Sequence, residues 1–202
     1  MARLIGVLGG TFDPPHIGHL ILADEAISAL DLDLIFWVLT PDPPHKQSQN
    51  ITPLGFRLRM VQETIKRSPA FQISNADIDR PAPHYSVGTM EWLREHYPDV
   101  KFFYLMGSDS LKNLPSWQAP QRFVDLCAGL GVMERDRLRP DLERMELEIP
   151  GIKDKTRYFD TPMVEVSGKD IRRRVREGRP YRYLVPHGVA EIIKRYDIYL
   201  DD

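Results

Sequence analysis

The sequence predicts an α/β protein with a doubly wound parallel sheet that is covered by helices on both faces. Short apolar segments alternate with amphipathic segments along most of the 202 residues. The apolar segments are continuous rather than alternating with polar residues, which is typical of strands buried on both faces. Glycines at 9–10 and 107 directly follow two of these segments. Because parallel sheets bind ligands at the carboxyl ends of their strands, both places are candidate binding loops.

The first elements have clear signals. Residues 3–8 are mostly apolar and are expected to form a strand that ends at the glycine pair. Residues 17–30 carry apolar side chains at helical spacing. The continuous apolar run 34–39 predicts a second strand, which the proline-rich residues 41–44 close. The remaining core elements alternate in the same way: helix 54–65, strand 71–74, a helix capped by Ser86, strand 100–106, helix 118–127 and strand 130–133.

The chain is expected to fold as one domain over 1–202. Its core would cover about 1–166, and a small helical portion would cover about 167–202. Ser167 is expected to cap the first helix of this portion, with Asp170 three positions on as its capping-box partner.

The part of the chain before this helical portion has a weaker signal. Residues 135–157 are charged and contain Pro140 and Pro150, so an irregular surface segment is expected there. The short apolar stretch 163–166 is expected to form a last strand.

Composition narrows the class of protein. A hydrophobic content of 42% and a charged content of 28% are ordinary for a globular domain. The net charge of −2 gives no reason to expect binding of nucleic acid or of an acidic membrane surface. The single cysteine, Cys127, fits a reducing cytosol, so we expect a cytoplasmic protein. No apolar stretch approaches the length of a membrane span, and a homo-oligomer is compatible with all of these observations.

The stretch GGTFDPPHIGHL, from Gly9 to Leu20, has the composition of a phosphate-binding turn. Glycines let the backbone approach an anion, and a helix that begins near Ile17 presents N–H groups and the positive end of its dipole. His16 and His19 lie three residues apart, so they face the same way on the first turn of that helix. Imidazoles placed there can donate hydrogen bonds to phosphate oxygens. The alternative is a strand-to-helix loop whose histidines only pack or cap.

The spacing matches neither of the common nucleotide motifs. No Gly-Lys-Ser/Thr follows, as a Walker loop requires, and the glycines are not spaced as in the dinucleotide fingerprint. The segment from Thr11 to His19 instead resembles the HxGH signature of the nucleotidyltransferase superfamily, whose members bind ATP and direct an attack on its α-phosphate. It also spells the HIGH motif of class I aminoacyl-tRNA synthetases. The chain has no evident KMSKS-type motif, and its length does not allow a tRNA-reading domain.

Further segments resemble the bacterial nicotinate-nucleotide adenylyltransferases. Residues 43–46 resemble their PPHK segment, and residues 106–117 closely resemble their GxDxLxxLPxW segment. Residues 183–189 resemble their YLxPxxV segment, and residues 84–90 resemble SYTxxTL with three departures. The motifs occur in the family's order and cover nearly the whole chain. The resemblance therefore implies a Rossmann-like nucleotidyltransferase fold.

One motif departs from the family pattern. The family's ISSTxIR reads VSGKDIR here. Ser167, Ile171 and Arg172 match, but the second Ser and the Thr are replaced by Gly168 and Lys169. Gly168 keeps a backbone N–H, and Lys169 could replace a hydrogen bond to the triphosphate with charge.

The resemblance implies adenylyl transfer from ATP to nicotinate mononucleotide, giving deamido-NAD and pyrophosphate. The phosphate of the mononucleotide would attack the α-phosphorus without a covalent enzyme intermediate, so alignment and charge stabilisation are the main tasks of the protein. The catalytic residues implied are His16, His19, Lys46 and Arg172. The implied ATP contacts are Gly9, Gly10, Thr11, Phe12, His16, His19, Gly107, Asp109, Ser167, Ile171 and Arg172. The implied mononucleotide contacts are Lys46, Tyr85, Ser86, Asp109 and Trp117.

Four of these residues also have a plain structural interpretation. Lys46 could be a solvated loop lysine, and Arg172 could belong to a solvated basic face. Trp117 could anchor the core after Pro115, and Asp109 could cap a short helix.

Magnesium is expected to arrive with ATP, held by phosphate oxygens and water. No cluster of His, Cys, Asp and Glu has the spacing of a protein-built metal site, so no protein ligand is assigned. Two other functions stay open. A pantetheine-phosphate adenylyltransferase would share the phosphate turn but would lack the segment around Trp117. A nucleotide-sensing protein without turnover is favoured only by the Gly168-Lys169 pair.

Overall fold

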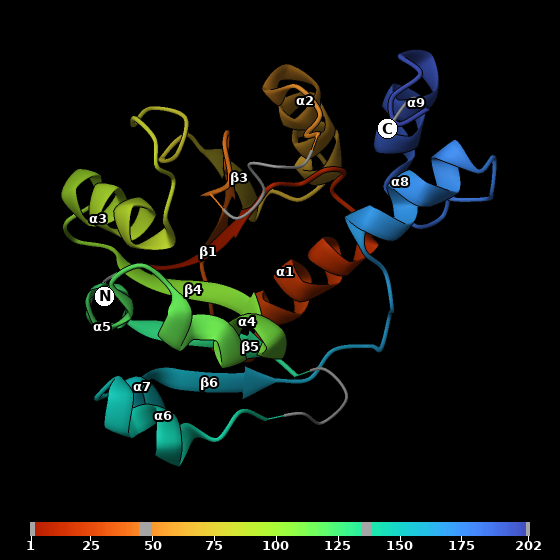
Figure 1. Ribbon diagram of the computed structural model, residues 1–202. Helices are drawn as coiled ribbons and strands as arrows, with labels where there is room; N and C mark the ends of the chain where they lie inside the picture. The colour runs from red at the N-terminus through yellow and green to blue at the C-terminus, as the bar shows by residue number, and fades with distance from the viewer. Residues whose placement is uncertain (1–2, 45–49, 135–138, 201–202) are drawn as a thin grey trace.

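The computed structural model of the chain describes residues 3–44, 50–134 and 139–200. Over these ranges a six-stranded sheet has the order β3-β2-β1-β4-β5-β6, and every neighbouring pair of strands is parallel. The strands are β1 (Leu4–Gly10), β2 (Leu34–Leu39), β3 (Phe71–Ser74), β4 (Lys101–Gly107), β5 (Gly129–Met133) and β6 (Thr156–Phe159). The predicted doubly wound α/β fold is confirmed (Figure 1).

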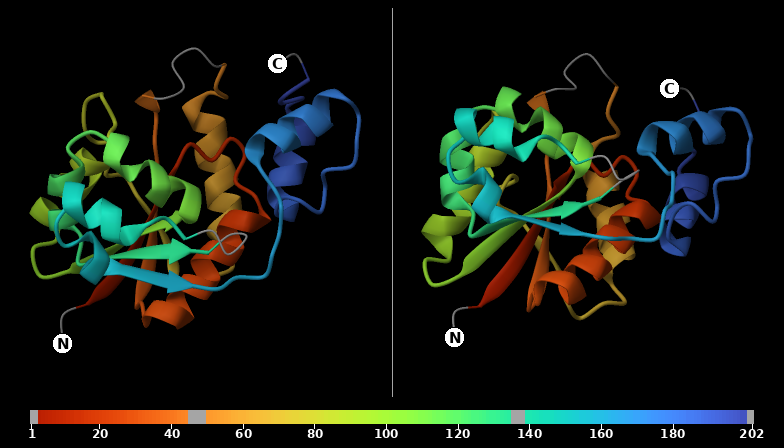
Figure 2. Two further views of the ribbon diagram at one scale, coloured as in Figure 1. Left: turned by 60° about the horizontal axis from the view of Figure 1, so that its bottom comes forward. Right: turned by 90° about the horizontal axis from the view of Figure 1, so that it is seen from below.

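Helices lie on both faces of the sheet, as Figures 1 and 2 show. They are α1 (Ile17–Leu30), α2 (Leu54–Ile65), α3 (Ser86–His96), α4 (Ser108–Asn113), α5 (Pro120–Leu126), α6 (Leu142–Glu148), α7 (Ile152–Lys155), α8 (Gly168–Arg176) and α9 (His187–Arg195). A 3₁₀ turn, η2 (Leu114–Ser116), follows α4.

Strand β2 shows why helices must cover both faces of the sheet. All its side chains are buried, and they alternate between two separate cores. Phe36 and Val38 belong to the core that α3 and α5 close, whereas Trp37 and Leu39 belong to the core that α1 and α2 close. A continuous apolar strand is the expected sequence for this position.

The sheet reverses its winding between β1 and β4. β1 pairs with β2 on one side and with β4 on the other, so the chain leaves these two central strands toward opposite faces. Gly10 at the end of β1 and Gly107 at the end of β4 therefore border the same crevice. The two candidate loops, nearly a hundred residues apart, meet at this edge.

The C-terminal helices form a third core of their own. Ile171 and Val175 of α8 pack with Val189 and Ile193 of α9. Met60 of α2, a helix that covers the sheet, belongs to the same core. In Figure 1 this portion sits beside the start of α1 and the end of α2. It therefore flanks the crevice from outside the sheet.

The expectation of an irregular segment over residues 135–157 is wrong for its described part. α6 and α7 lie there, and β6 begins at Thr156. The helices are short and mostly charged, and they bury only Met145, Ile149 and Ile152 against the core, so their periodic signal is weak. Residues 163–166 are not a strand; they belong to the connection between β6 and α8, where Met163 is 74% exposed and Val166 packs in the C-terminal core.

Of the two predicted helix caps, the one at Ser86 is wrong and the one at Ser167 is confirmed without its capping-box partner. Ser86 is the first residue of α3, and Tyr85 occupies the N-cap position. Ser167 does cap α8 by accepting a hydrogen bond from the Asp170 N–H at 3.1 Å. The Asp170 carboxylate, however, pairs with Arg173 and Arg174 instead of returning to the cap. Within the described ranges, none of the helices is long and apolar enough to cross a membrane.

Candidate active site

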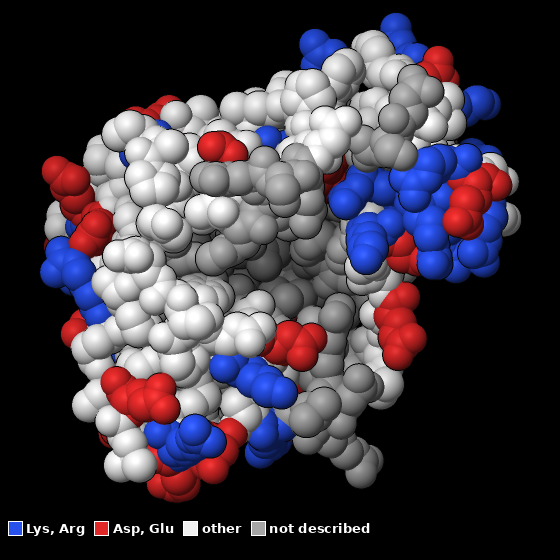
Figure 3. Space-filling model, viewed as in Figure 1, with Lys and Arg blue, Asp and Glu red and all other residues white. Residues whose placement is uncertain are grey.

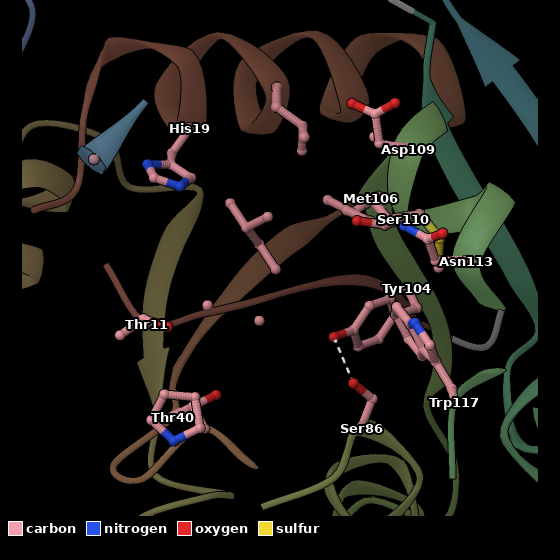
Figure 4. A pocket seen from close by; sticks show the side chains of 18 of the residues that line it. Thr11, His19, Thr40, Ser86, Tyr104, Met106, Asp109, Ser110, Asn113 and Trp117 are labelled. Carbon is pink, nitrogen blue, oxygen red and sulfur yellow. Dashed lines mark hydrogen bonds between the residues drawn. The ribbon is translucent and has the colours of Figure 1, made fainter. Parts of the chain in front are cut away.

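A cavity of about 600 Å³ opens at the crevice between β1 and β4. Figure 3 shows the hollow on this face, with Lys and Arg side chains gathered beside it over α8. Strand ends, the start of α1, the start of α3 and the segment from α4 to Trp117 supply its walls (Figure 4). The residues singled out from the sequence that line it are Gly9, Gly10, Thr11, His16, His19, Tyr85, Ser86, Gly107, Asp109, Trp117 and Ser167.

The two histidines form one unit at the start of α1. Their rings stack with centroids 3.7 Å apart and an interplanar angle of 27°. The backbone N–H of His16 donates to Nδ1 of His19 at 3.1 Å. Because Nδ1 accepts this bond, the neutral His19 ring carries its proton on Nε2. Figure 4 shows the His19 ring projecting from α1 into the cavity, and the donor group of this tautomer is Nε2–H.

The start of α1 offers an anion fewer N–H groups than the sequence suggests. The Ile17 N–H donates to the carbonyl of Leu184 at 3.1 Å, and the His19 N–H donates to the His16 carbonyl at 3.0 Å. The helix dipole still points its positive end at the cavity. Hydrogen bonding at this end therefore depends mainly on the imidazoles and on the glycine-rich turn.

The described part of the cavity wall contains no Lys or Arg. Arg172 lies behind the phosphate turn, where its guanidinium donates to the backbone carbonyl of Asp13 at 2.7 Å. Lys46 falls outside the described residues, although Pro43 and Pro44 just before it line the cavity. Within the described part of the wall, favourable potential for an anion comes from the start of α1 and from the start of α8, where Ser167 and Gly168 line the cavity.

Besides Arg172, two further expected ATP contacts do not reach the cavity. Phe12 is 2% exposed, and its ring packs against Trp37 and against the edge of His19. Ile171 is fully buried in the C-terminal core. Both were expected at the ligand from their place in motifs. The structure places them behind it, as packing for the turn and for α8.

The wall opposite the histidines combines an aromatic surface with hydroxyl groups. The Ser86 hydroxyl lies 3.1 Å from the Tyr104 hydroxyl, which Figure 4 marks with a dashed line. Trp117 is half-buried and meets the Tyr104 ring edge-on at 6.1 Å. Burial raises the pKa of Tyr104 to about 12, so this hydroxyl keeps its proton at neutral pH.

Sequence reasoning missed several residues of the cavity wall. Thr40 directly follows the carboxyl end of β2, which the strand-end rule could have indicated, whereas Tyr104 lies in the middle of β4. Ser110 and Asn113 lie on α4 beside Asp109 (Figure 4). His84 also lines the wall. Burial lowers the pKa of His84, which favours its neutral form at pH 7.

A buried polar group behind the wall holds α3 next to β2. The Asp77 carboxylate, 2% exposed, accepts hydrogen bonds from Thr40 at 3.0 Å and from Thr89 at 2.6 Å. It also pairs with Arg80 at 3.0 Å, and Arg80 in turn donates to the carbonyl of Tyr85. Asp77 and Arg80 therefore hold the start of α3 in place on the side away from the cavity.

Arg57 fastens the loops on the other side of the cavity. Its side chain is 2% exposed and donates to four backbone carbonyls, those of Thr11, Thr40, Pro41 and Thr52, at 2.7 to 3.0 Å. One guanidinium thus ties the phosphate turn to the end of β2 and to the start of α2.

A second cavity of about 550 Å³ adjoins the first and shares several wall residues with it, including Gly18, Asp109 and Ser167. Ile21, Met163 and Val164 line it together with charged side chains that include Glu134, Asp170 and Arg174. The two cavities therefore lie next to each other beside the start of α1.

Gly168 allows the start of α8 to lie directly against the phosphate turn. A Cβ atom at this position would lie 2.7 Å from the carbonyl oxygen of Asp13. Such a contact is too short for any side chain, so the glycine lets α8 begin directly against the turn. The departure from the family motif at this position therefore has a packing reason.

Among the residues the structure describes, no group of three or more His, Cys, Asp and Glu could hold a metal ion. Asp109 is a carboxylate that faces the cavity, on the first turn of α4 (Figure 4). It sits across the cavity from His19.

Comparisons with known proteins agree with this geometry. The cytidylyltransferase-like family model matches residues 7–174. A curated protein of Thermomicrobium roseum, named "Probable nicotinate-nucleotide adenylyltransferase", is 42% identical over 199 residues, which cover 98% of this chain and 92% of the relative. A protein of Geobacillus thermodenitrificans with the same name is 36% identical over 195 residues. This match covers 96% of this chain and 85% of the relative.

Solved structures give the same fold. The nicotinic acid mononucleotide adenylyltransferase of Plasmodium falciparum, complexed with NaAD, superposes with a TM-score of 0.79 at 18% identity, over 98% of this chain and 97% of that one. The chain therefore belongs to the cytidylyltransferase-like family and, within it, to the nicotinate-nucleotide adenylyltransferases.

Proposed function

We propose that this protein transfers the adenylyl group of ATP to nicotinate mononucleotide, giving deamido-NAD and pyrophosphate. The observation that carries the proposal is the shape of the site. Donors for a triphosphate, centred on His19, face an aromatic and hydroxyl-bearing wall, with Trp117 and Ser86, across one cavity. An adjoining cavity, with both apolar and polar side chains in its wall, leaves room for a nucleoside beyond the phosphates.

The triphosphate is proposed to lie along Gly10 and Thr11, with the imidazoles of His16 and His19 beside it. Nε2–H of His19 then donates to an oxygen on the α-phosphate or on the leaving pyrophosphate, where negative charge grows as the bond breaks. The base and ribose extend past Gly18 and Asp109 into the second cavity.

The mononucleotide is proposed to occupy the opposite wall. Its pyridine ring lies against Trp117, and its carboxylate faces Ser86 and the backbone at the start of α3. Its phosphate then points toward the α-phosphorus of ATP. An oxygen of that phosphate forms the new P–O bond while the bond to pyrophosphate breaks on the opposite side.

The proposal gives Lys46 and Arg172, both expected at the phosphates, different roles. Lys46 remains proposed as a charge that neutralises a substrate phosphate. Arg172 is proposed to act through the phosphate turn, since its guanidinium holds the Asp13 carbonyl. Magnesium is proposed to enter on the triphosphate, with phosphate oxygens and water as its ligands.

Pyrophosphate release from ATP tests the proposal directly, with nicotinate mononucleotide, nicotinamide mononucleotide or 4′-phosphopantetheine as the second substrate. Release with nicotinate mononucleotide is the expected result. Release only with phosphopantetheine would support the other adenylyltransferase, and ATP binding without any release would support a nucleotide sensor.

Substitution of His19 tests the proposed site. His19→Asn keeps an acceptor for the His16 N–H but removes the Nε2 donor, so turnover is expected to fall at least about a hundredfold with the fold intact. His19→Ala should lose as much turnover and also the cap. His96→Ala, on the exposed end of α3, is the matched control. Equal turnover in His19→Asn and the control would refute the role of His19.

A further inference from the structure

A buried carboxylate lies at the centre of the phosphate turn. Asp13 is 6% exposed and stands between Phe12 and the proline pair, three residues before His16. One carboxylate oxygen accepts the backbone N–H of Thr52 at 3.2 Å, and the other accepts the hydroxyl of Tyr199 at 2.6 Å. Its side chain is therefore held from two directions that are far apart in the sequence.

Tyr199 comes from the very end of the described chain. It lies beyond α9, is 5% exposed, and has a backbone φ of +74°. A non-glycine residue in this left-handed region is strained, and it persists only where its surroundings hold it. Packing in the C-terminal core and the bond to Asp13 supply that hold. Burial beside Asp13 also raises the pKa of Tyr199, so its hydroxyl remains a donor at neutral pH.

The same C-terminal portion contacts the turn at three further points. Arg172 of α8 donates to the Asp13 carbonyl at 2.7 Å, and Gly168 lies directly against that oxygen. The carbonyl of Leu184 accepts the first N–H of α1, from Ile17, at 3.1 Å. The residues on both sides of His16 are thus fixed by this portion of the chain.

We propose that Tyr199, through its hydrogen bond to Asp13, is a positioning residue that sets the phosphate turn and the His16–His19 pair for adenylyl transfer. The inference rests on the proposed function. It means that the C-terminal helical portion positions the catalytic histidines in addition to packing against α1 and α2. Tyr199 itself does not line the cavity and contacts no substrate.

The test is Tyr199→Phe, which removes one hydroxyl and keeps the ring. The matched control is Tyr196→Phe on the same segment, whose ring is 42% exposed. Steady-state pyrophosphate release is measured for both with ATP and nicotinate mononucleotide. Tyr199→Phe is expected to lower kcat at least about tenfold and to leave KM for the mononucleotide within about twofold, because the opposite wall is untouched. Tyr196→Phe should match the wild type.

A double-mutant cycle with Asp13→Asn shows whether the effect passes through the carboxylate. If it does, the double variant loses no more turnover than Asp13→Asn alone. Additive losses, or a Tyr199→Phe protein with wild-type kcat and a lower Tm, would overturn the proposal and leave a purely structural contact. If Tyr199→Phe does not fold, Asp13→Asn alone must lower kcat with unchanged mononucleotide KM, and wild-type kinetics there would also overturn it.

A readout that does not depend on turnover separates this inference from the proposed function. The ring C–H resonances of His16 and His19 in NMR spectra are expected to move in Tyr199→Phe and to stay in place in Tyr196→Phe. An inactive wild type would refute the proposed function, while unmoved resonances would refute the positioning role.

Discussion

Replacing Arg57 by methionine gives the sharpest test of how the site is held together. Methionine fills much of the same volume but leaves the carbonyls of Thr11, Thr40, Pro41 and Thr52 without their donor. A net hydrogen bond contributes about 1 kcal/mol, so the four bonds put the loss of unfolding free energy at about 4 kcal/mol. Burial lowers the pKa of Arg57, because desolvation disfavours its charge. This cost offsets part of the stabilisation that the four hydrogen bonds supply.

Urea unfolding followed by tryptophan fluorescence measures this loss, and Arg59→Met on the exposed side of α2 is the control. A loss of about 4 kcal/mol corresponds to a fall in Tm of roughly 8 to 16 °C for a chain of this size. Arg57→Met is expected to show that fall, and Arg59→Met is expected to stay within about 0.5 kcal/mol of the wild type. If the two variants unfolded at the same urea concentration, the bonds to the four carbonyls would not stabilise the loops, and the reasoning would be refuted.

Two further predictions concern other parts of the molecule. Trp117→Ala should raise KM for nicotinate mononucleotide at least about tenfold and leave KM for ATP unchanged, whereas Trp92→Ala, which stacks on His96 outside the cavity, should change neither. Equal changes in both constants for Trp117→Ala, with a lower Tm, would favour a core role. Cys127 is 2% exposed and burial raises its pKa to about 12, so it should react with a thiol reagent only after unfolding. Since an unfolded thiol ionises near pH 8.5 to 9, Cys127 should lower the unfolding free energy by up to about 1.4 kcal/mol per pH unit above that range, and Cys127→Ala should make the fall between pH 9 and 10 shallower.

Most of the fold could be predicted because buried parallel strands carry a strong local signal. The run 34–39 is apolar at every position, and it became β2 with the predicted bounds. The helix from Ile17 to Leu30 was also predicted with its bounds. β6 was missed because this four-residue edge strand buries only its two end residues, Thr156 and Phe159, and the exposed Arg157 interrupts its apolar pattern.

The candidate site was predictable where motif residues face the cavity directly. His16, His19 and Trp117 all line it. Motif membership did not distinguish residues at the ligand from residues behind it, so Arg172 was expected at the phosphates and lies against the Asp13 carbonyl. The bond between Asp13 and Tyr199 joins positions 186 apart and leaves no local pattern in the sequence.

Gly168 shows what a motif comparison overlooks. Read one position at a time, the exchange of serine for glycine removes a hydroxyl and counts as a lost contact. In three dimensions the exchange changes a separation, because helix α8 now starts against the Asp13 carbonyl with no room for a side chain between them. A side chain at position 168 would therefore force either α8 or the turn that holds His16 and His19 to move, so one small residue sets how close the last helices stand to the site.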